Sequence, residues 1–144
     1  MTRCLVCEGA VEQFLSFGQM PLANGFLAAE EFGREYFFEL SVGHCPSCHM
    51  VQLTRQVERE RMFHDSYPFF SSTSVRMATH FQELAADVTR RFLQRPDPLV
   101  VEVGSNDGIL LRHFARAGVR HLGIEPSGNV ARVAQEQGIR TVCA

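Results

Sequence analysis

Lysine and tryptophan are missing from this 144-residue sequence, and no apolar stretch reaches the roughly 18 residues that a membrane-spanning helix needs. The absence of lysine excludes a phosphate-binding P-loop, and all 14 basic side chains are arginine. The arginines are scattered and the formal net charge is −2, so we expect no nucleic-acid partner. The first residues contain no apolar signal sequence, and we expect a cytoplasmic protein without a membrane partner.

Four of the five cysteines form two pairs with the same spacing, Cys4-x-x-Cys7 and Cys45-x-x-Cys48. In a reducing compartment such pairs indicate a metal before they indicate disulfides. Zinc takes four tetrahedral ligands and binds thiolates well, so these cysteines are predicted to hold one zinc ion. Four protein ligands leave no position for a reactive water, which makes the predicted role structural.

The second cysteine pair has two other interpretations. Cys45-Pro46-Ser47-Cys48-His49 matches the pattern of c-type haem attachment, but that chemistry needs export and leaves the first pair unexplained. A thioredoxin-like redox pair would open a helix after a strand, and this pair does not. Zinc therefore stays the preferred ligand.

The first 60 residues predict a small β module. The aromatic and β-branched run 36–42 predicts a strand, and residues 50–53 predict a strand that returns after the second cysteine turn. Residues 18–25 are expected to form a loop. We interpret 1–60 as an amino-terminal zinc-binding domain.

An aromatic segment and a helix follow. Apolar side chains recur at helical spacing between Met77 and Phe92, which predicts a helix over residues 74–94. Ser72, Thr73 or Ser74 is expected to cap it. We assign residues 61–96 to a linking region.

From residue 97 onward, strands and helices alternate. The composition is that of a globular protein, 45% hydrophobic and 21% charged. The expected strands are 99–103, 119–124 and 139–142, and the expected helices are 109–117 and 129–137. This alternation is typical of a parallel sheet covered by helices, so we expect residues 97–144 to begin an α/β domain.

The loop after the first of these strands has a pattern that suits a nucleotide ligand. It reads E-x-G-x-x-x-G from Glu102 to Gly108, and Gly104 lets a ligand lie against the backbone. Glu125 ends the next strand, where a carboxylate can accept hydrogen bonds from a ribose. Asp107 would repel a pyrophosphate, which favours the cationic S-adenosylmethionine over NAD. The alternative is a plain tight turn followed by a surface glutamate.

Several stretches occur together in one order. They are Cys4-Leu5-Val6-Cys7, Met20-Pro21-Leu22-Ala23-Asn24-Gly25-Phe26-Leu27, Cys45-Pro46-Ser47-Cys48, Tyr67-Pro68-Phe69-Phe70-Ser71-Ser72, Glu102-Val103-Gly104-Ser105-Asn106-Asp107-Gly108 and Gly123-Ile124-Glu125-Pro126-Ser127. Through these stretches, which extend over nearly the whole chain, the sequence resembles the S-adenosylmethionine-dependent C-methyltransferases that act on nucleotide-linked keto-deoxysugars. The resemblance implies a zinc-binding domain followed by a truncated Rossmann-like class I methyltransferase fold.

The resemblance also implies roles for individual residues. The zinc ligands would be Cys4, Cys7, Cys45 and Cys48, and the cofactor-binding residues would be Glu102, Gly104, Ser105, Asn106, Gly108, Glu125 and Pro126. Tyr67, Ser71 and Ser72 would lie near the active site, with Tyr67 as the candidate catalytic residue. Phe69 stands where such enzymes often have a second tyrosine. The alternative role for this segment is a hydrophobic staple ahead of the helix.

The function implied by the resemblance is methyl transfer to a carbon of the sugar. Such enzymes are longer than this chain, so we expect an inactive fragment whose nucleotide-sugar substrate binds to the absent C-terminal part. One alternative is a zinc-stabilised interaction module or degenerate methyltransferase, which would bind metal but no cofactor. A second is a zinc-containing RNA methyltransferase, which would need a basic stripe that the sequence does not supply. The open sheet edge is expected to promote self-association.

Overall fold

The structure, a computed structural model, describes residues 2–23 and 25–144. Asn24, which belongs to one of the stretches that carry the resemblance, lies outside the described residues. The chain divides into two compact units, Met1–Met62 and Phe63–Ala144. No helix of the described residues is long and apolar enough to cross a membrane.

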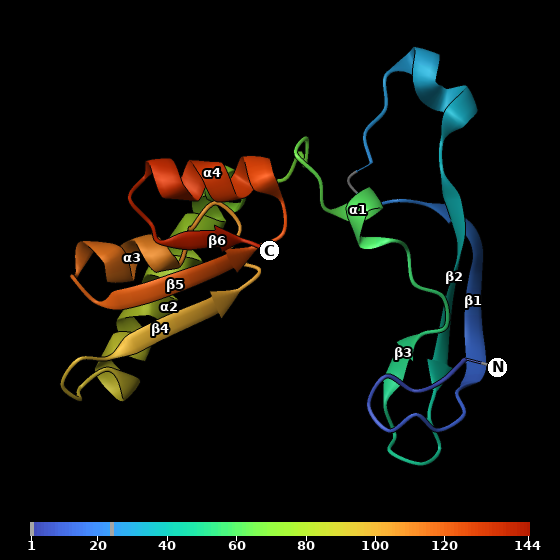
Figure 1. Cartoon of the computed structure of the whole chain (residues 1–144), viewed down its shortest axis with the longest axis horizontal. Coiled ribbons are helices and arrows are strands. Elements are labelled where there is room, and N and C mark those ends of the chain that lie inside the picture. Colours follow the sequence, from blue (N-terminus) through green and yellow to red (C-terminus); the bar gives the residue numbers. More distant parts are fainter. Residues whose placement is uncertain (1, 24) are drawn as a thin grey trace. The chain divides into compact units, whose positions relative to one another are not determined.

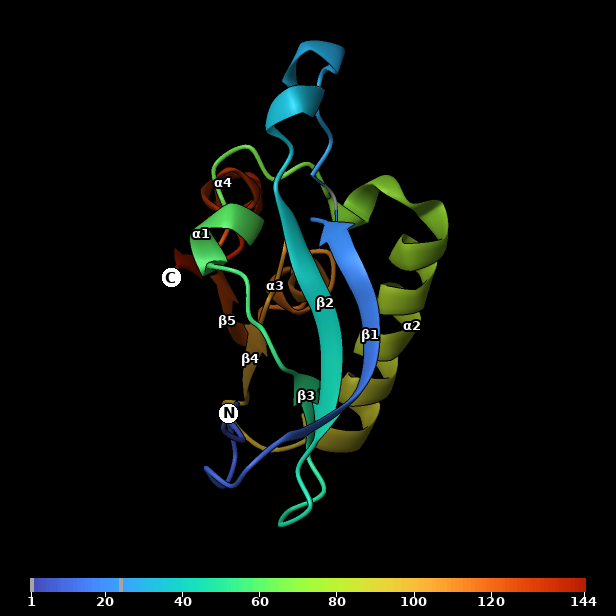
Figure 2. The ribbon, with the colours of Figure 1, turned by 90° about the vertical axis from the view of Figure 1, so that its right-hand side faces the viewer.

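The first unit is a three-stranded antiparallel sheet in the order β1-β2-β3. The strands are β1 (Glu12–Pro21), β2 (Phe37–His44) and β3 (Val51–Leu53), accompanied by the 3-10 helix η1 (Ala29–Arg34) and the short helix α1 (Arg59–Met62). Strands β1 and β2 run side by side as a long ribbon (Figures 1 and 2). The two strands predicted for this region are confirmed.

The loop predicted to start at residue 18 is wrong in its first half, because β1 continues to Pro21. Gly18 has φ +74°, and the register between β1 and β2 shifts between Ser16 and Gln19. A bulge of this kind accommodates extra residues inside a strand. A glycine in the sequence is compatible with both a bulge and a turn, so the sequence alone does not tell them apart.

The interior of the first unit is polar. Ser41 and Gln52 are buried, and the Gln52 side chain accepts a hydrogen bond from the Leu5 N–H at 2.9 Å and donates one to the Arg3 carbonyl at 3.2 Å. Among the described residues of this unit, the buried apolar side chains are those of Cys4 and Cys45. The described part of this unit therefore lacks a hydrocarbon core, and we expect its folding to depend on hydrogen bonds and on the cysteine cluster.

The second unit is a parallel sheet in the order β4-β5-β6, with helices in the connections. It comprises the 3-10 helix η2 (Ser71–Thr73), α2 (Val75–Phe92), β4 (Leu99–Val103), α3 (Leu111–Arg116), β5 (Arg120–Glu125), α4 (Gly128–Glu136) and β6 (Thr141–Cys143). The expected α/β alternation and Rossmann-like parallel sheet are confirmed. Ser74 caps α2, accepting a hydrogen bond from the Met77 N–H at 3.3 Å.

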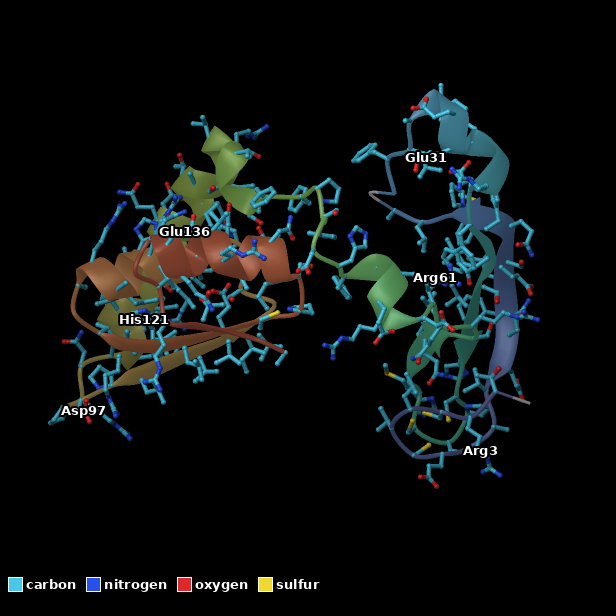
Figure 3. All side chains as sticks on the ribbon, turned by 45° about the horizontal axis from the view of Figure 1, so that its top comes forward. Arg3, Glu31, Arg61, Asp97, His121 and Glu136 are labelled. Carbon is cyan, nitrogen blue, oxygen red and sulfur yellow. The ribbon has the colours of Figure 1, made fainter. Side chains whose placement is uncertain are left out.

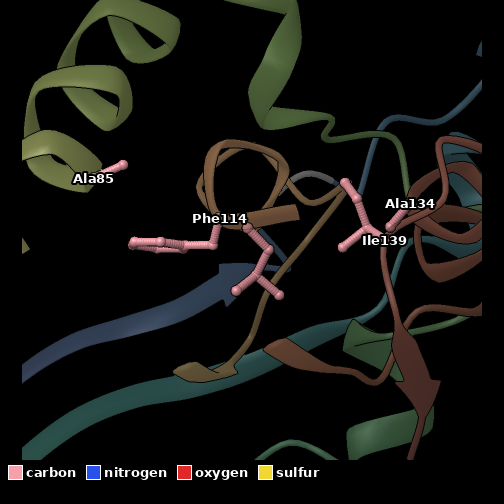
Figure 4. Packing of buried hydrophobic residues seen from close by; sticks show 5 residues of the cluster. Ala85, Phe114, Ala134 and Ile139 are labelled. Carbon is pink, nitrogen blue, oxygen red and sulfur yellow. The ribbon is translucent and has the colours of Figure 1, made fainter. Parts of the chain in front are cut away.

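The core of the second unit lies between the sheet and its helices. Five buried side chains form it: Ala85, Leu111, Phe114, Ala134 and Ile139. Figure 4 shows the Phe114 ring pointing toward Ala85 of α2, and Ile139 beside Ala134 of α4. This packing fixes both helices that follow the carboxyl ends of β4 and β5.

One face of the second sheet is uncovered in the part of the chain that the structure describes. Val100 of β4 packs against the core, whereas Leu99, Val101 and Val103 on the opposite face are 54%, 50% and 80% exposed. Alternate residues of a strand point to opposite faces, so β4 is buried on one side only.

Candidate metal centre and cofactor loop

The four paired cysteines converge at one end of the first unit. Their sulfur atoms all lie within 4.8 Å of one another, and Sγ–Sγ is 3.5 Å for Cys4–Cys48 and for Cys7–Cys45. Figure 3 shows sulfur atoms gathered beside Arg3. A tetrahedral zinc ion with Zn–S bonds of about 2.3 Å needs sulfurs about 3.8 Å apart. All four cysteines are free thiols, so the donor set fits zinc without rearrangement.

The first cysteine turn is built by backbone hydrogen bonds. The Cys4 N–H donates to the Gly9 carbonyl at 2.8 Å, and the Glu8 N–H donates to the Cys4 carbonyl at 2.9 Å. Glu8 adopts φ +61°, a conformation that costs a non-glycine residue free energy. The tight turn brings both sulfurs of the Cys-x-x-Cys unit to the same side.

The second cysteine turn repeats the first. The Cys45 N–H donates to the Met50 carbonyl and the His49 N–H donates to the Cys45 carbonyl, both at 2.8 Å, while His49 has φ +63°. The rings of His44 and His49 stack with centroids 5.6 Å apart. Neither histidine belongs to the metal-ligand group found among the described residues.

Hydrogen bonds from backbone N–H groups lower the pKa of two of the four cysteine thiols. Hydrogen bonds from the backbone of Cys48 and Ser47 lower the pKa of Cys45 to about 6, although burial opposes them. The backbone of Cys7 and Val6 likewise lowers the pKa of Cys4. Thiolates are the form that binds zinc, so the turns position the ligands and favour the ionised form of Cys4 and Cys45. The neighbouring cysteine thiols and burial instead raise the pKa of Cys48 to about 12.

The cofactor loop follows β4 and contains three residues with positive φ: Gly104 (+72°), Asn106 (+49°) and Gly108 (+77°). At Gly104, the position that a Cβ would take has no atom within 4 Å, so a ligand can lie against this backbone. At Gly108 an added Cβ would collide with the Ile139 side chain. The first glycine therefore leaves open space, and the second allows close packing.

Glu125 is held inside the protein by the loops around it. It is 4% exposed, and its two carboxylate oxygens accept hydrogen bonds from the Asn106 N–H at 2.8 Å and the Ser127 N–H at 2.9 Å. The carboxylate joins the cofactor loop to the start of α4. Its role toward a ribose stays a prediction, as does that of the neighbouring half-buried Pro126.

The remaining loop residues face in different directions. Ser105 is buried, and its Oγ lies 2.5 Å from the position that a Cβ on Gly123 would take, so it points toward β5. Asp107 is 1% exposed and its Oδ2 accepts a hydrogen bond from the Ser72 N–H at 2.9 Å. One carboxylate oxygen of Asp107 thus binds the protein's own backbone, the other has no partner among the described residues, and the preference for a cationic ligand stays a prediction.

Ser71 and Ser72 of the aromatic segment bind the cofactor loop, whereas Tyr67 binds the first turn of α4, and the role of all three near an active site stays a prediction. The Ser71 N–H donates to Asn106 Oδ1 at 2.8 Å, and the Tyr67 carbonyl accepts a hydrogen bond from Asn129 Nδ2 at 2.8 Å. Asn129 was not singled out from the sequence. Its signal would have been an asparagine in the first turn of the helix after the acidic strand end.

Glu102 is partly buried on β4, and its Oε2 has no partner among the described residues. Burial raises the pKa of its carboxyl to about 7. The native state therefore holds this proton more tightly than the unfolded chain, whose glutamate has a pKa of about 4.3. Glu102 consequently lowers stability as the pH rises from about 4.3 to 7.

We expect Glu102→Gln to stabilise the second unit by about 1–2 kcal/mol at pH 8, after allowance for solvent screening of a partly exposed group. At pH 5 the gain should be much smaller, because the native carboxyl is protonated there. Urea unfolding at both pH values, followed in a Tyr36→Phe background that leaves Tyr67 as the single tyrosine, measures the difference. An equal gain at both pH values would show that the effect is not one of ionisation.

The fold and the site define a zinc-binding α/β protein with a glycine loop at the carboxyl ends of a parallel sheet. Residues 4–63 match a methyltransferase family model described as a putative zinc binding domain. The chain is 34% identical over 131 residues to the C-methyltransferase NovU of Streptomyces niveus, a match that covers 90% of this chain and 31% of that protein. These matches confirm the predicted resemblance of this chain to the N-terminal part of a zinc-containing C-methyltransferase, and they support the predicted zinc binding. The chain spans about a third of the length of the curated relative that it matches.

Proposed function

We propose that this chain forms the zinc-binding module and the first part of the S-adenosylmethionine site of a C-methyltransferase that acts on a nucleotide-linked keto-deoxysugar. The observation that carries the proposal is the open backbone at Gly104, beside the buried Glu125 at the end of the neighbouring strand. In open parallel sheets, ligands bind at the carboxyl ends of the strands. The similarity to a C-methyltransferase supports the reaction class.

The residues fit the cofactor in their chemistry. The backbone at Gly104 is accessible to the methionine end, and Glu102 and Glu125 supply carboxylates for the ammonium group and the ribose hydroxyls. When bound, S-adenosylmethionine supplies an electrophilic methyl group. The described residues contribute binding and orientation. Tyr67 is the candidate catalytic side chain because its segment is hydrogen-bonded to the cofactor loop. The general base is not assigned to any residue of this chain.

Two glycines allow a matched test of the cofactor site. Gly104 and Gly118 have φ of +72° and +69°, and neither has an atom within 4 Å of the position of an added Cβ. Alanine at either position should therefore cost about the same, roughly 1 kcal/mol of strain in the left-handed region. Gly118 precedes β5 at the opposite ends of the strands, so only Gly104→Ala places a methyl group where the ligand is proposed to lie.

We expect the full chain, loaded with zinc, to bind S-adenosylhomocysteine in isothermal titration calorimetry. Gly104→Ala should weaken binding about tenfold or more, equivalent to about 1.4 kcal/mol, while Gly118→Ala leaves it unchanged. Equal affinities for both variants would place the ligand elsewhere. Zinc binding without any ligand binding would favour the alternative, a zinc-stabilised interaction module, which the bare apolar face around Val101 also fits.

The partners of the chain follow from the same proposal. The nucleotide-sugar would bind to further parts of the enzyme, consistent with the relative's greater length.

Cytoplasmic location is supported by the four free thiols of the metal centre, which suit a reducing compartment. Self-association through the sheet edge stays a prediction, which the unpaired edges of β4 and β6 support among the described residues.

A further inference from the structure

A strap of residues 65–72 crosses the carboxyl ends of β4 and β5 and is fixed from both loops that follow these strands. From the loop after β4, Asn106 and Asp107 bind the strap at Ser71 and Ser72. After β5, the helix α4 begins with Gly128, where an added Cβ would collide with Asp65 of the strap. The strap therefore lies where a parallel sheet binds its ligands.

Asn106 makes the most complete contact with the strap. Its Oδ1 accepts a hydrogen bond from the Ser71 N–H at 2.8 Å, and its Nδ2 donates to the Phe69 carbonyl at 3.2 Å. The amide side chain thus substitutes for a backbone unit and pairs with the strap as a neighbouring strand would. Its own backbone N–H donates to Glu125 at 2.8 Å, so one residue joins the strap, the cofactor loop and the end of β5.

Two further contacts reinforce this attachment. Asp107, buried beneath the strap, accepts a hydrogen bond from the Ser72 N–H at 2.9 Å. Asn129 Nδ2 donates to the Tyr67 carbonyl at 2.8 Å. The Tyr67 and Phe69 carbonyls come from a segment without regular secondary structure, and the Ser71 and Ser72 N–H groups lie at the start of the short helix η2. Side chains therefore supply the hydrogen-bond partners that a longer strand or helix would otherwise provide.

We propose that Asn106 is a positioning residue that makes the strap a wall of the cofactor site. This inference rests on the proposed function. Its side chain is committed to the strap, so Asn106 acts on a bound ligand through Tyr67 and Phe69 and through the backbone of the loop. The loop proposed to bind the ligand also holds the strap. Ligand binding should therefore order the strap, and by linkage an ordered strap should strengthen ligand binding by the same factor.

The test replaces Asn106 in the full chain with zinc bound. Asn106→Gly keeps a residue that adopts φ +49° readily and removes both side-chain bonds. Asn106→Asp tolerates the same backbone and keeps the acceptor for Ser71 but loses the donor to Phe69. The matched control is Gln135→Ala, which removes a side-chain amide bond to the Thr141 carbonyl in the same unit, away from the strap.

Two readouts report on the strap directly. Hydrogen exchange should show the Ser71 and Ser72 amides losing about tenfold or more of their protection in Asn106→Gly, because a hydrogen bond to each is lost or loosened. The chain has two tyrosines and no tryptophan, so a Tyr36→Phe background leaves Tyr67 as the single fluorophore. The anisotropy of Tyr67 should fall in Asn106→Gly, recover partly in Asn106→Asp, and stay unchanged in Gln135→Ala.

Binding of S-adenosylhomocysteine separates the inference from the proposed function. The inference predicts that binding protects the strap amides in the wild-type chain, and that Asn106→Gly weakens binding about tenfold. Unchanged protection in Asn106→Gly would overturn the inference. A loosened strap with unchanged affinity would also overturn it, while leaving the proposed function in place. A wild-type chain that binds no S-adenosylhomocysteine would overturn the proposed function and the inference with it.

Discussion

Removal of zinc should unfold the first unit and leave the second folded. Among the described residues of the first unit, the buried apolar side chains belong to two of the four metal ligands, Cys4 and Cys45. Without the metal, a 62-residue unit keeps only a polar interior and a half-exposed sheet, which is too little to offset the chain entropy of folding. A structural zinc site contributes about 10–16 kcal/mol of apparent free energy in zinc-finger peptides.

The experiment compares two exposed cysteines. Cys7→Ser removes a metal ligand, and Cys143→Ser removes an exposed thiol outside the cluster. We expect trypsin to cut Cys7→Ser rapidly at Arg34 and Arg55, both in the first unit, and hydrogen exchange there to lose its protection. The Cys143→Ser variant should behave as the wild-type chain does.

The same pattern should appear when a strong chelator strips the wild-type chain, and added zinc should reverse it. Native mass spectrometry counts the ion before and after. A chelated first unit that keeps its amide protection would show that the hydrogen-bonded sheet is stable by itself, and that the metal centre is not what folds this unit. Loss of protection in both units together would contradict their independence.

The metal centre could be predicted from the sequence because its signal is local. The spacing Cys4-x-x-Cys7 alone determines a turn that directs two sulfurs to one side, and its repetition at Cys45-x-x-Cys48 completes the set. The bulged continuation of β1 past Gly18 had no such signal, since a glycine marks a turn and a bulge equally.

The cofactor loop was found by its pattern, but the direction of its side chains was not. The sequence placed Asn106 and Asp107 in the loop, and only the structure shows that both bind the strap. The partners are 35 residues away along the chain, and no periodicity connects side chains to backbone groups at that distance. Glu125 was likewise expected to accept hydrogen bonds from a ribose, and only the structure shows that it is buried, with both carboxylate oxygens bound to backbone N–H groups.

Glu125→Ala should be the most damaging single substitution in the second unit. Both carboxylate oxygens accept backbone N–H groups, and the residue is 4% exposed. Alanine would leave the donors of Asn106 and Ser127 without partners inside the protein. Hydrogen bonds to a charged group contribute about 1.5–3 kcal/mol each, so we expect a loss of about 3–5 kcal/mol in the free energy of unfolding. The exposed Glu136→Ala should change it by less than about 0.5 kcal/mol.

Glu125→Gln separates the structural role from a role in binding. The glutamine keeps one acceptor oxygen and turns an amide group toward the other backbone donor, so about half of the stability loss of Glu125→Ala is expected by urea unfolding. If Glu125 also accepts the ribose hydroxyls, the affinity for S-adenosylhomocysteine should fall about tenfold or more even at temperatures where the variant is fully folded. If affinity is unchanged there, Glu125 serves only to join the cofactor loop to α4, and the ribose must be bound by another group.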